Sequence, residues 1–471
     1  MSYRLVAPGA LPAASFSLTH MNGRLSRFHQ MTLLGLALVA CAAATAQPVT
    51  SEPLAKPLVA TSFGGSSENA SAVKAPTLSL NQLVQAVVDH NPELRGVEQS
   101  RVTAQAAVVS AGALPNPKLE FSQGQNSARL PSTNPGTVQS YGISIPIELP
   151  GVRSARIGAA KAGERASVQQ IEVTRNVLVA QVQLKAYEVV LRKAQAKAAY
   201  EAVRLLEQAH ERVRVRVQSG EAPRYEIIKA DAELINARQQ EQSARLLAEQ
   251  SLLTLNRLAA GHLPMPFELS LSLEDPVNVQ ALEATNQMSH PELQQLQTEI
   301  DRAQAQVDGA RASRWPGVDL RVGHTREPDV RQNMIGVSVQ IPLFDQRKGQ
   351  IDEASSELER ARLRLEGRQA ELQQQIQLAW KSLEMAQTRT KALGQGAVRE
   401  AEAALRVAEA AYRYGERGIL DVLDAQRVLR NVRADLLEAR YQLQAARIEL
   451  DFLAGRFASS NVAVNAATNA R

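Results

Sequence analysis

The chain has 471 residues, only 4% of them aromatic, and its 53 basic and 48 acidic residues give a formal net charge of +5. Charges of both signs are interleaved, so no one-sign surface suggests nucleic acid, and the low aromatic content is unlike a compact enzyme. The single cysteine excludes an internal disulfide framework, and no catalytic or metal-binding motif is found among the seven histidines or elsewhere. We therefore expect no enzyme, no cofactor, no metal and no nucleic-acid partner. The abundant Ala, Gln, Leu, Glu and Arg favour long packed helices.

Residues 1–40 are predicted to be a signal peptide, because two arginines precede an apolar run too short to span a membrane. The long stretch before this run suggests Met21 as the true start. The sequence Leu-Val-Ala-Cys ending at Cys41 resembles the lipobox of bacterial lipoproteins, so we expect Cys41 to be lipidated. An ordinary A-x-A cleavage site ending at Ala46 is the alternative. Residues 41–76, rich in Pro, Ser, Ala and Gly, are predicted to be a flexible linker.

Two helices are expected next. Apolar residues at helical spacing over 80–88 predict an amphipathic helix. Asn91 is a candidate N-cap with Pro92 at the first helical position, and this second helix should run to about Ala113. The sequence Leu-Pro-Asn-Pro that starts at Leu114 then stops it.

Two short segments of period two follow, over about 118–125 and 138–147. In the second, tyrosine and isoleucines alternate with Gly, Ser and Pro. A later segment, 335–341, shows the same alternation more cleanly. Apolar residues on one face and small or polar residues on the other are typical of outer-membrane strands. An ordinary hairpin on a soluble core gives the same period, so the strands alone do not decide.

Long proline-free stretches over about 153–218 and 347–414 each predict some 65 helical residues, or roughly 100 Å of helix. Each stretch ends at a glycine phrase, after which the chain returns. Apolar and small residues recur at heptad spacing on the last return, which predicts a close-packed coiled-coil seam. These seam residues are Val422, Ala425, Leu429, Val432, Leu436, Ala439, Leu443, Ala446, Leu450 and Leu453.

The chain is a duplication with a period of about 195 residues, far longer than a solenoid repeat. The matched phrases are Asn91–Leu94 with His290–Leu293, Ile147–Ile157 with Ile341–Ile351, and Gly220–Ala230 with Gly415–Ala425. We expect repeat 1 over 77–270, repeat 2 over 271–457 and a disordered tail over 458–471. A soluble coiled coil would explain the seam but neither the strands nor the duplication.

The duplication predicts four membrane-type strands per chain, which cannot close a barrel, and an open edge is not tolerated in lipid. Three chains would supply twelve strands, within the known range of outer-membrane barrels. The predicted fold is therefore mainly α with membrane β. Four strands per chain would join a shared trimeric barrel, and the long helical hairpins would form a tunnel below it.

The ordered, duplicated motifs resemble the TolC-like outer-membrane efflux proteins over about 77–457. The resemblance rests on Asn91–Leu94, Leu114–Pro117 and above all Gly415–Ala425. It implies a homotrimer in outer-membrane lipid with a periplasmic tunnel, a passive duct that receives substrate from a periplasmic adaptor and an inner-membrane pump of the resistance-nodulation-division type. The phrase Glu148–Arg156 is most similar to the branch that serves cobalt, zinc and cadmium resistance. Drug or organic-compound efflux and type I secretion are the alternatives.

The resemblance also implies site residues at the ends of the two hairpins. By position from the tip glycine, Asp421 and Asp424 correspond to the periplasmic gate of the family. A gate latch is implied at Tyr412, Arg417 and Glu226. The adaptor-docking tips would be Gly220 with Glu221 and Gly415 with Glu416. Two acids near a helix N-terminus could equally be ordinary solvated charges.

Two proteins of other classes also contain long hairpins. A periplasmic adaptor should have one hairpin flanked by β-rich segments, whereas this chain has two hairpins and no all-β half. A structural coiled-coil envelope protein would not migrate as a heat-resistant outer-membrane trimer, which distinguishes it from a duct.

Overall fold

The computed structural model describes residues 76–127, 131–132, 134–277 and 290–458. The predicted signal peptide, Cys41, most of the linker and the tail lie outside these residues. The helices of the first repeat are α1 (Leu80–His90), α2 (Pro92–Gly112), α3 (Pro150–Gln218) and α4 (Arg224–Leu258). Those of the second repeat are α6 (Pro291–Ala312), α7 (Lys348–Ala392), α8 (Val398–Arg413) and α9 (Ile419–Leu453), with a π-helical segment η2 (Leu393–Ala397) between α7 and α8.

The start of the first repeat follows its local sequence signals. Ser79 caps α1 through a reciprocal capping box with Gln82. The Asn91 side chain accepts hydrogen bonds from the backbone N–H groups of Glu93 and Leu94, with Pro92 at the first position of α2. Both predicted helices and the predicted cap are confirmed.

The strands form one four-stranded antiparallel sheet in the order β2-β3-β5-β6. Its members are β2 (Lys118–Asn126), β3 (Gly136–Ile147), β5 (Gly317–Arg326) and β6 (Arg331–Gln340). Two-residue strands β1 (Thr77–Leu78) and β4 (Glu268–Leu269) pair in parallel elsewhere. Two strands come from each repeat, so the sheet is itself duplicated, and β2 and β6 are its open edges.

The two faces of the four-stranded sheet differ as the alternation predicted. One face carries exposed apolar side chains, such as Leu119 at 80% and Ile335 at 79% exposure, in the register Leu119–Ile143–Val322–Ile335. The other face carries small and polar residues, is concave, and its members Ser140 and Thr325 lie 3.1 Å apart, hydroxyl to hydroxyl. A soluble sheet would bury its apolar face, so this arrangement favours lipid on the apolar side.

The residues that follow β3, Glu148–Arg156, connect the sheet to the helices. Arg156 on α3 forms an ion pair with Glu148 and donates hydrogen bonds to the carbonyls of Ala111 and Ala113. Arg153 donates to the carbonyl of Gly112 at 2.8 Å. These carbonyls end α2, where cations are favourable. Much of the Glu148–Arg156 phrase therefore has a structural role.

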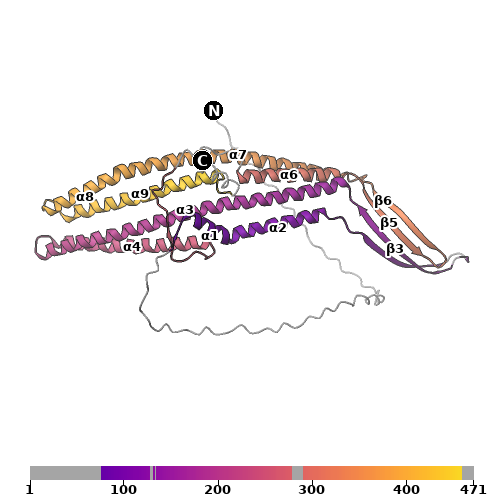
Figure 1. Ribbon diagram of the computed structural model, residues 1–471, viewed down its shortest axis with the longest axis horizontal. Coiled ribbons are helices and arrows are strands. Elements are labelled where there is room, and N and C mark those ends of the chain that lie inside the picture. Colours follow the sequence, from indigo (N-terminus) through magenta and orange to yellow (C-terminus); the bar gives the residue numbers. More distant parts are fainter. Residues whose placement is uncertain (1–75, 128–130, 133, 278–289, 459–471) are drawn as a thin grey trace, which may run out of the picture. The chain divides into compact units, whose positions relative to one another are not determined.

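The 69-residue helix α3 is the spine of the first repeat, and at 1.5 Å per residue it extends about 100 Å. It packs against α2 and α6 toward the sheet and against α4 toward its far end (Figure 1). The corresponding helix of the second repeat runs without a gap through α7, η2 and α8, so the prediction of some 65 helical residues over about 347–414 is confirmed. The η2 segment is a wider, π-helical turn within it and contains Gly394 and Gly396, because glycine stabilises a regular helix poorly and tolerates the wider turn.

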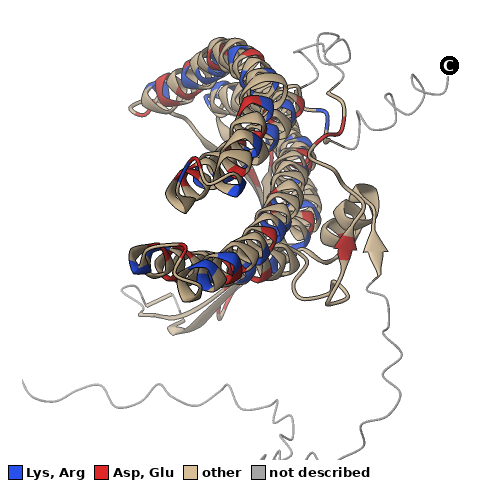
Figure 2. Cartoon of the chain, turned by 90° about the vertical axis from the view of Figure 1, so that its left-hand side faces the viewer, with Lys and Arg blue, Asp and Glu red and all other residues tan. Residues whose placement is uncertain are grey.

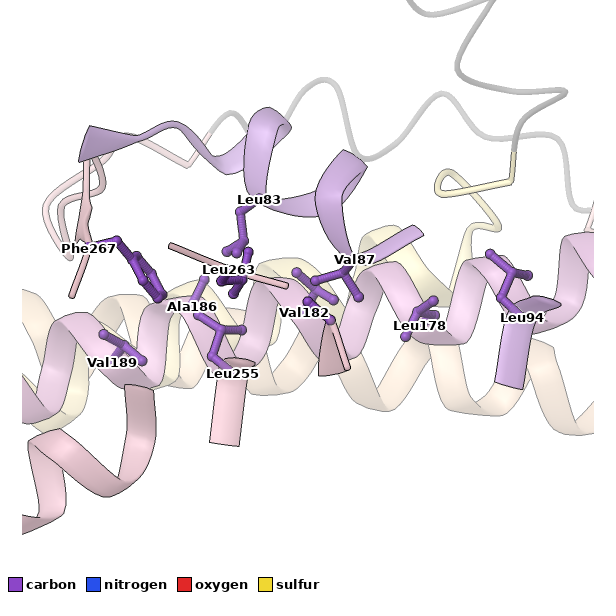
Figure 3. Packing of buried hydrophobic residues seen from close by; sticks show 11 residues of the cluster. Leu83, Val87, Leu94, Leu178, Val182, Ala186, Val189, Leu255, Leu263 and Phe267 are labelled. Atoms are coloured by element: carbon purple, nitrogen blue, oxygen red, sulfur yellow. The ribbon is translucent and has the colours of Figure 1, made fainter. Parts of the chain in front are cut away.

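Three layers of helix meet in the main apolar cluster (Figure 3). Leu83 and Val87 of α1 contact Val182 and Ala186 of α3, with Leu255 of α4 beneath. All five are fully buried. On α9, six of the ten predicted seam residues are buried, among them Val422, Leu436 and Ala439, which confirms the coiled-coil seam.

None of the helices in the described part of the chain is both long and apolar enough to cross a membrane.

Candidate functional site at the hairpin tips

The two hairpins end in the same turn. Gly220 follows α3 with φ +81° and Gly415 follows α8 with φ +75°, a left-handed conformation that suits glycine. In the first turn the Glu221 N–H donates to the Arg216 carbonyl at 2.8 Å, and in the second the Glu416 N–H donates to the Ala411 carbonyl at 2.9 Å. Both are Schellman caps, so the duplicated glycine phrase produces a duplicated turn.

The predicted gate residues lie on the first two turns of α9. Asp421 is in the first turn, where the helix dipole favours an acid, and both Asp421 and Asp424 are exposed. Each has an arginine neighbour on its own hairpin: Arg417 Nη1 lies 3.5 Å from Asp421, and Arg427 Nη1 lies 3.2 Å from Asp424. Arg427 also bonds Glu233 of α4, 2.5 Å away. The two carboxylates are therefore partly neutralised within one chain.

The two hairpins touch through an arginine that the sequence analysis did not select. The guanidinium of Arg216, at the end of α3, lies over the ring of Tyr412 on α8, 4.8 Å from its centroid. Arg216 also lies 3.7 Å from the carboxylate of Glu221. The Tyr412 hydroxyl and then the nearby carboxylates raise the pKa of Arg216, which stays charged. This is a cation–π contact between hairpins.

Glu226 crosses between hairpins at a second point. It occupies the first turn of α4, and one carboxylate oxygen lies 3.5 Å from the position that a Cβ would take on Gly418, the residue that precedes α9. Within the described part of the chain, its other oxygen is buried without a hydrogen-bond partner. A buried carboxylate oxygen without a partner costs free energy, so this contact contributes little to holding the hairpins together in the single chain.

Beneath these polar contacts an apolar cluster joins the hairpins. Val213 of α3 and Ile419 of α9 are almost fully buried, and the partly buried Tyr412 packs against the same cluster. The other buried members are Val203, Leu206, Leu234, Ala237, Val422 and Leu423. Figure 2 views the helices from this end and shows basic and acidic residues intermixed along them.

The structure brings Tyr412 and Glu226 to the interface between hairpins, as the latch interpretation expects. In the structure the Arg417 guanidinium pairs with the Asp421 carboxylate, so a contact between Arg417 and Glu226 stays a prediction. The latch role of Tyr412 and the gate role of Asp421 likewise stay predictions.

Arg216 could have been found from the sequence by comparing the two repeats. Arg216 corresponds to Ala411 and Tyr412 to Val217, so each partner of the cation–π contact is present in one repeat only. Both residues of this contact between the repeats therefore depart from the internal symmetry of the chain.

Among the described residues, no group of three or more His, Cys, Asp or Glu side chains is placed to hold a metal ion. The charged groups that this site presents to a solute are carboxylates and guanidinium groups.

A sheet with an exposed apolar face, joined to paired helical hairpins in a duplicated chain, defines an outer-membrane duct. The family model described as outer membrane efflux protein matches residues 83–261 and 285–456, and the chain belongs to this family. It is an outer-membrane efflux protein and not an enzyme.

Sequence relatives agree over most of the chain. The cobalt-zinc-cadmium resistance protein CzcC of Cupriavidus metallidurans is 25% identical over 386 residues, which covers 81% of this chain and 91% of CzcC. Protein CyaE of Bordetella pertussis is 24% identical over 60% of this chain and 64% of its own length.

Solved structures share the fold. CusC matches with a TM-score of 0.68 at 19% identity, over 80% of this chain and 91% of that chain. The open state of the MtrE outer-membrane channel of Neisseria gonorrhoeae matches with a TM-score of 0.67 at 19% identity, over 82% and 93%. The predicted TolC-like fold is confirmed.

Proposed function

We propose that three copies of this chain form the outer-membrane duct of a tripartite efflux system. The open edges β2 and β6 support this proposal, because unpaired strand edges cannot face lipid. Pairing the edge of one chain with that of the next would close the barrel and satisfy the backbone groups. Native mass measurement of the detergent-solubilised protein tests the assembly, and a stable monomer or dimer would refute it.

The hairpin tips are proposed to close the periplasmic end. Asp421 and Asp424 of three chains would form two acidic rings, since residues three apart share a helix face. Tyr412, Glu226 and Arg417 would hold the hairpins inward. An adaptor that engages the Gly220 and Gly415 turns would release them, and an inner-membrane pump of the resistance-nodulation-division type would drive transport.

The proposed substrates are heavy-metal cations. The observation that carries this proposal is the match with a cobalt-zinc-cadmium resistance protein over 81% of the chain. Carboxylate rings at the tip also suit cations better than anions. The alternatives are organic compounds or a secreted protein.

A deletion strain tests the substrate. We expect greater sensitivity to cobalt, zinc and cadmium salts, restored by the wild-type gene, with unchanged sensitivity to organic toxicants. The matched control is a strain that expresses Gly415→Pro, which should assemble but fail to dock, because proline cannot adopt the positive φ of this turn. Sensitivity to organic toxicants alone would reassign the substrate class and leave the duct intact.

A further inference from the structure

The outer end of the sheet carries a pair of arginines on its apolar face. Arg326 and Arg331 close the β5–β6 hairpin as direct cross-strand partners, so their side chains leave the same face. His324 and Asn333 lie two residues further along each strand and therefore share that face; their side chains are hydrogen-bonded at 2.7 Å. Two further steps lead to Val322 and Ile335, which belong to the exposed apolar surface.

The depth of the pair follows from the register. The apolar rows begin at Ile147, Val318 and Val339 and end at the row that contains Phe121 and Tyr141. These rows span about 20 Å along the strands, at about 3.3 Å per residue. An aromatic girdle marks the edge of the hydrocarbon in such sheets. Arg326 and Arg331 lie about 7 Å beyond the girdle, which is the depth of lipid headgroups.

Within the described part of a single chain, neither guanidinium group has a hydrogen-bond or ion-pair partner, and both residues are exposed. The two acids of the intervening loop form hydrogen bonds with asparagines and no ion pair with either arginine. Glu327 accepts a hydrogen bond from Asn126 at 3.4 Å, and Asp329 accepts one from the Asn134 side chain at 2.7 Å. Like charges directly opposite on two strands are destabilising unless an anion lies between them. Two positive charges placed directly opposite each other on neighbouring strands would attract a singly or doubly charged anion.

We propose that Arg326 and Arg331 bind the phosphate of a glycolipid in the outer leaflet of the membrane. A guanidinium matches phosphate oxygens in bidentate geometry, and basic residues beside the hydrocarbon attract anionic headgroups. The acyl chains of the same lipid would lie along the apolar rows below. One lipid would thus satisfy both parts of the surface, the cationic pair and the apolar rows.

Delipidated protein in detergent, titrated with bisphosphorylated lipid A and followed by native mass spectrometry, tests the proposal. Arg326→Gln with Arg331→Gln should weaken binding about 25-fold, and each single variant about fivefold. The matched control is Arg321→Gln, because Arg321 lies on the same strand but faces the concave side. This control should bind as the wild type does.

Dephosphorylated lipid A should bind the wild-type protein as weakly as phosphorylated lipid A binds the double variant. Equal affinity of the wild-type protein and the double variant for phosphorylated lipid A would overturn the proposal. Equal binding of the two lipids would also overturn it, because the contact would then belong to the acyl chains alone. If the double variant fails to assemble, Arg326→Lys with Arg331→Lys preserves the charge and should retain phosphate-dependent binding.

Discussion

The contact between Arg216 and Tyr412 predicts how strongly the two hairpins are held together. Replacing Arg216 by methionine keeps the aliphatic bulk and removes the charge. The side chain of Arg216 is 32% exposed, so the cation–π contact is worth about 0.5–1 kcal/mol, and the exposed ion pair with Glu221 adds about 0–1 kcal/mol. We therefore estimate a loss of about 1 kcal/mol per chain.

In a trimer whose hairpins open together, three such losses amount to about 3 kcal/mol. An equilibrium between closed and open tips would then shift by about two orders of magnitude. Single-channel recordings in planar bilayers measure this shift as higher conductance or longer open times for Arg216→Met. The matched control is Arg214→Met, because Arg214 pairs with Glu211 on its own helix and should leave conductance unchanged.

Two substitutions of Tyr412 separate the ring from the hydroxyl. Tyr412→Phe keeps a ring beneath Arg216, so it should change conductance little, whereas Tyr412→Leu should open the tips as far as Arg216→Met does. A large effect of Tyr412→Phe with Arg417→Ser would instead assign the latch to the hydroxyl and Arg417. Unchanged conductance in both Arg216→Met and Tyr412→Leu would refute the reasoning, because the tips would then be held elsewhere.

Three further outcomes are expected. Mass spectrometry of the mature protein should show Cys41 as an acylated N-terminus, and an unmodified later N-terminus would reject lipidation. Asp421→Ala with Asp424→Ala should abolish block of the pore by multivalent cations, and persistent block would place the constriction at other residues. Arg156→Ala, which removes an ion pair and two hydrogen bonds to the end of α2, should cost about 1–3 kcal/mol and lower the temperature at which the assembly unfolds. Arg165→Ala should have little effect, because its ion pair with Asp301 is half exposed, and an equal loss in both variants would contradict this account.

The sequence by itself determined the elements whose signals are local. The Asn91 cap, the glycine turns at Gly220 and Gly415, the period-two strands and the heptad seam on α9 all follow from interactions between residues close in the chain. The duplication then showed the same order of elements in both repeats, which is why the fold class could be predicted. Alternation in the 138–147 segment predicted two unlike faces, and the long helices and the duplication then favoured lipid on the apolar one.

Only the tertiary structure decided which side chains meet between repeats. The partnership of Arg216 with Tyr412 joins residues that are far apart in sequence, and neither helix by itself indicates the other as its partner. The pairing of Arg417 with Asp421, a local contact, was missed because a flexible side chain can choose among several acids within reach. Local propensity selects elements, whereas long-range contacts select partners.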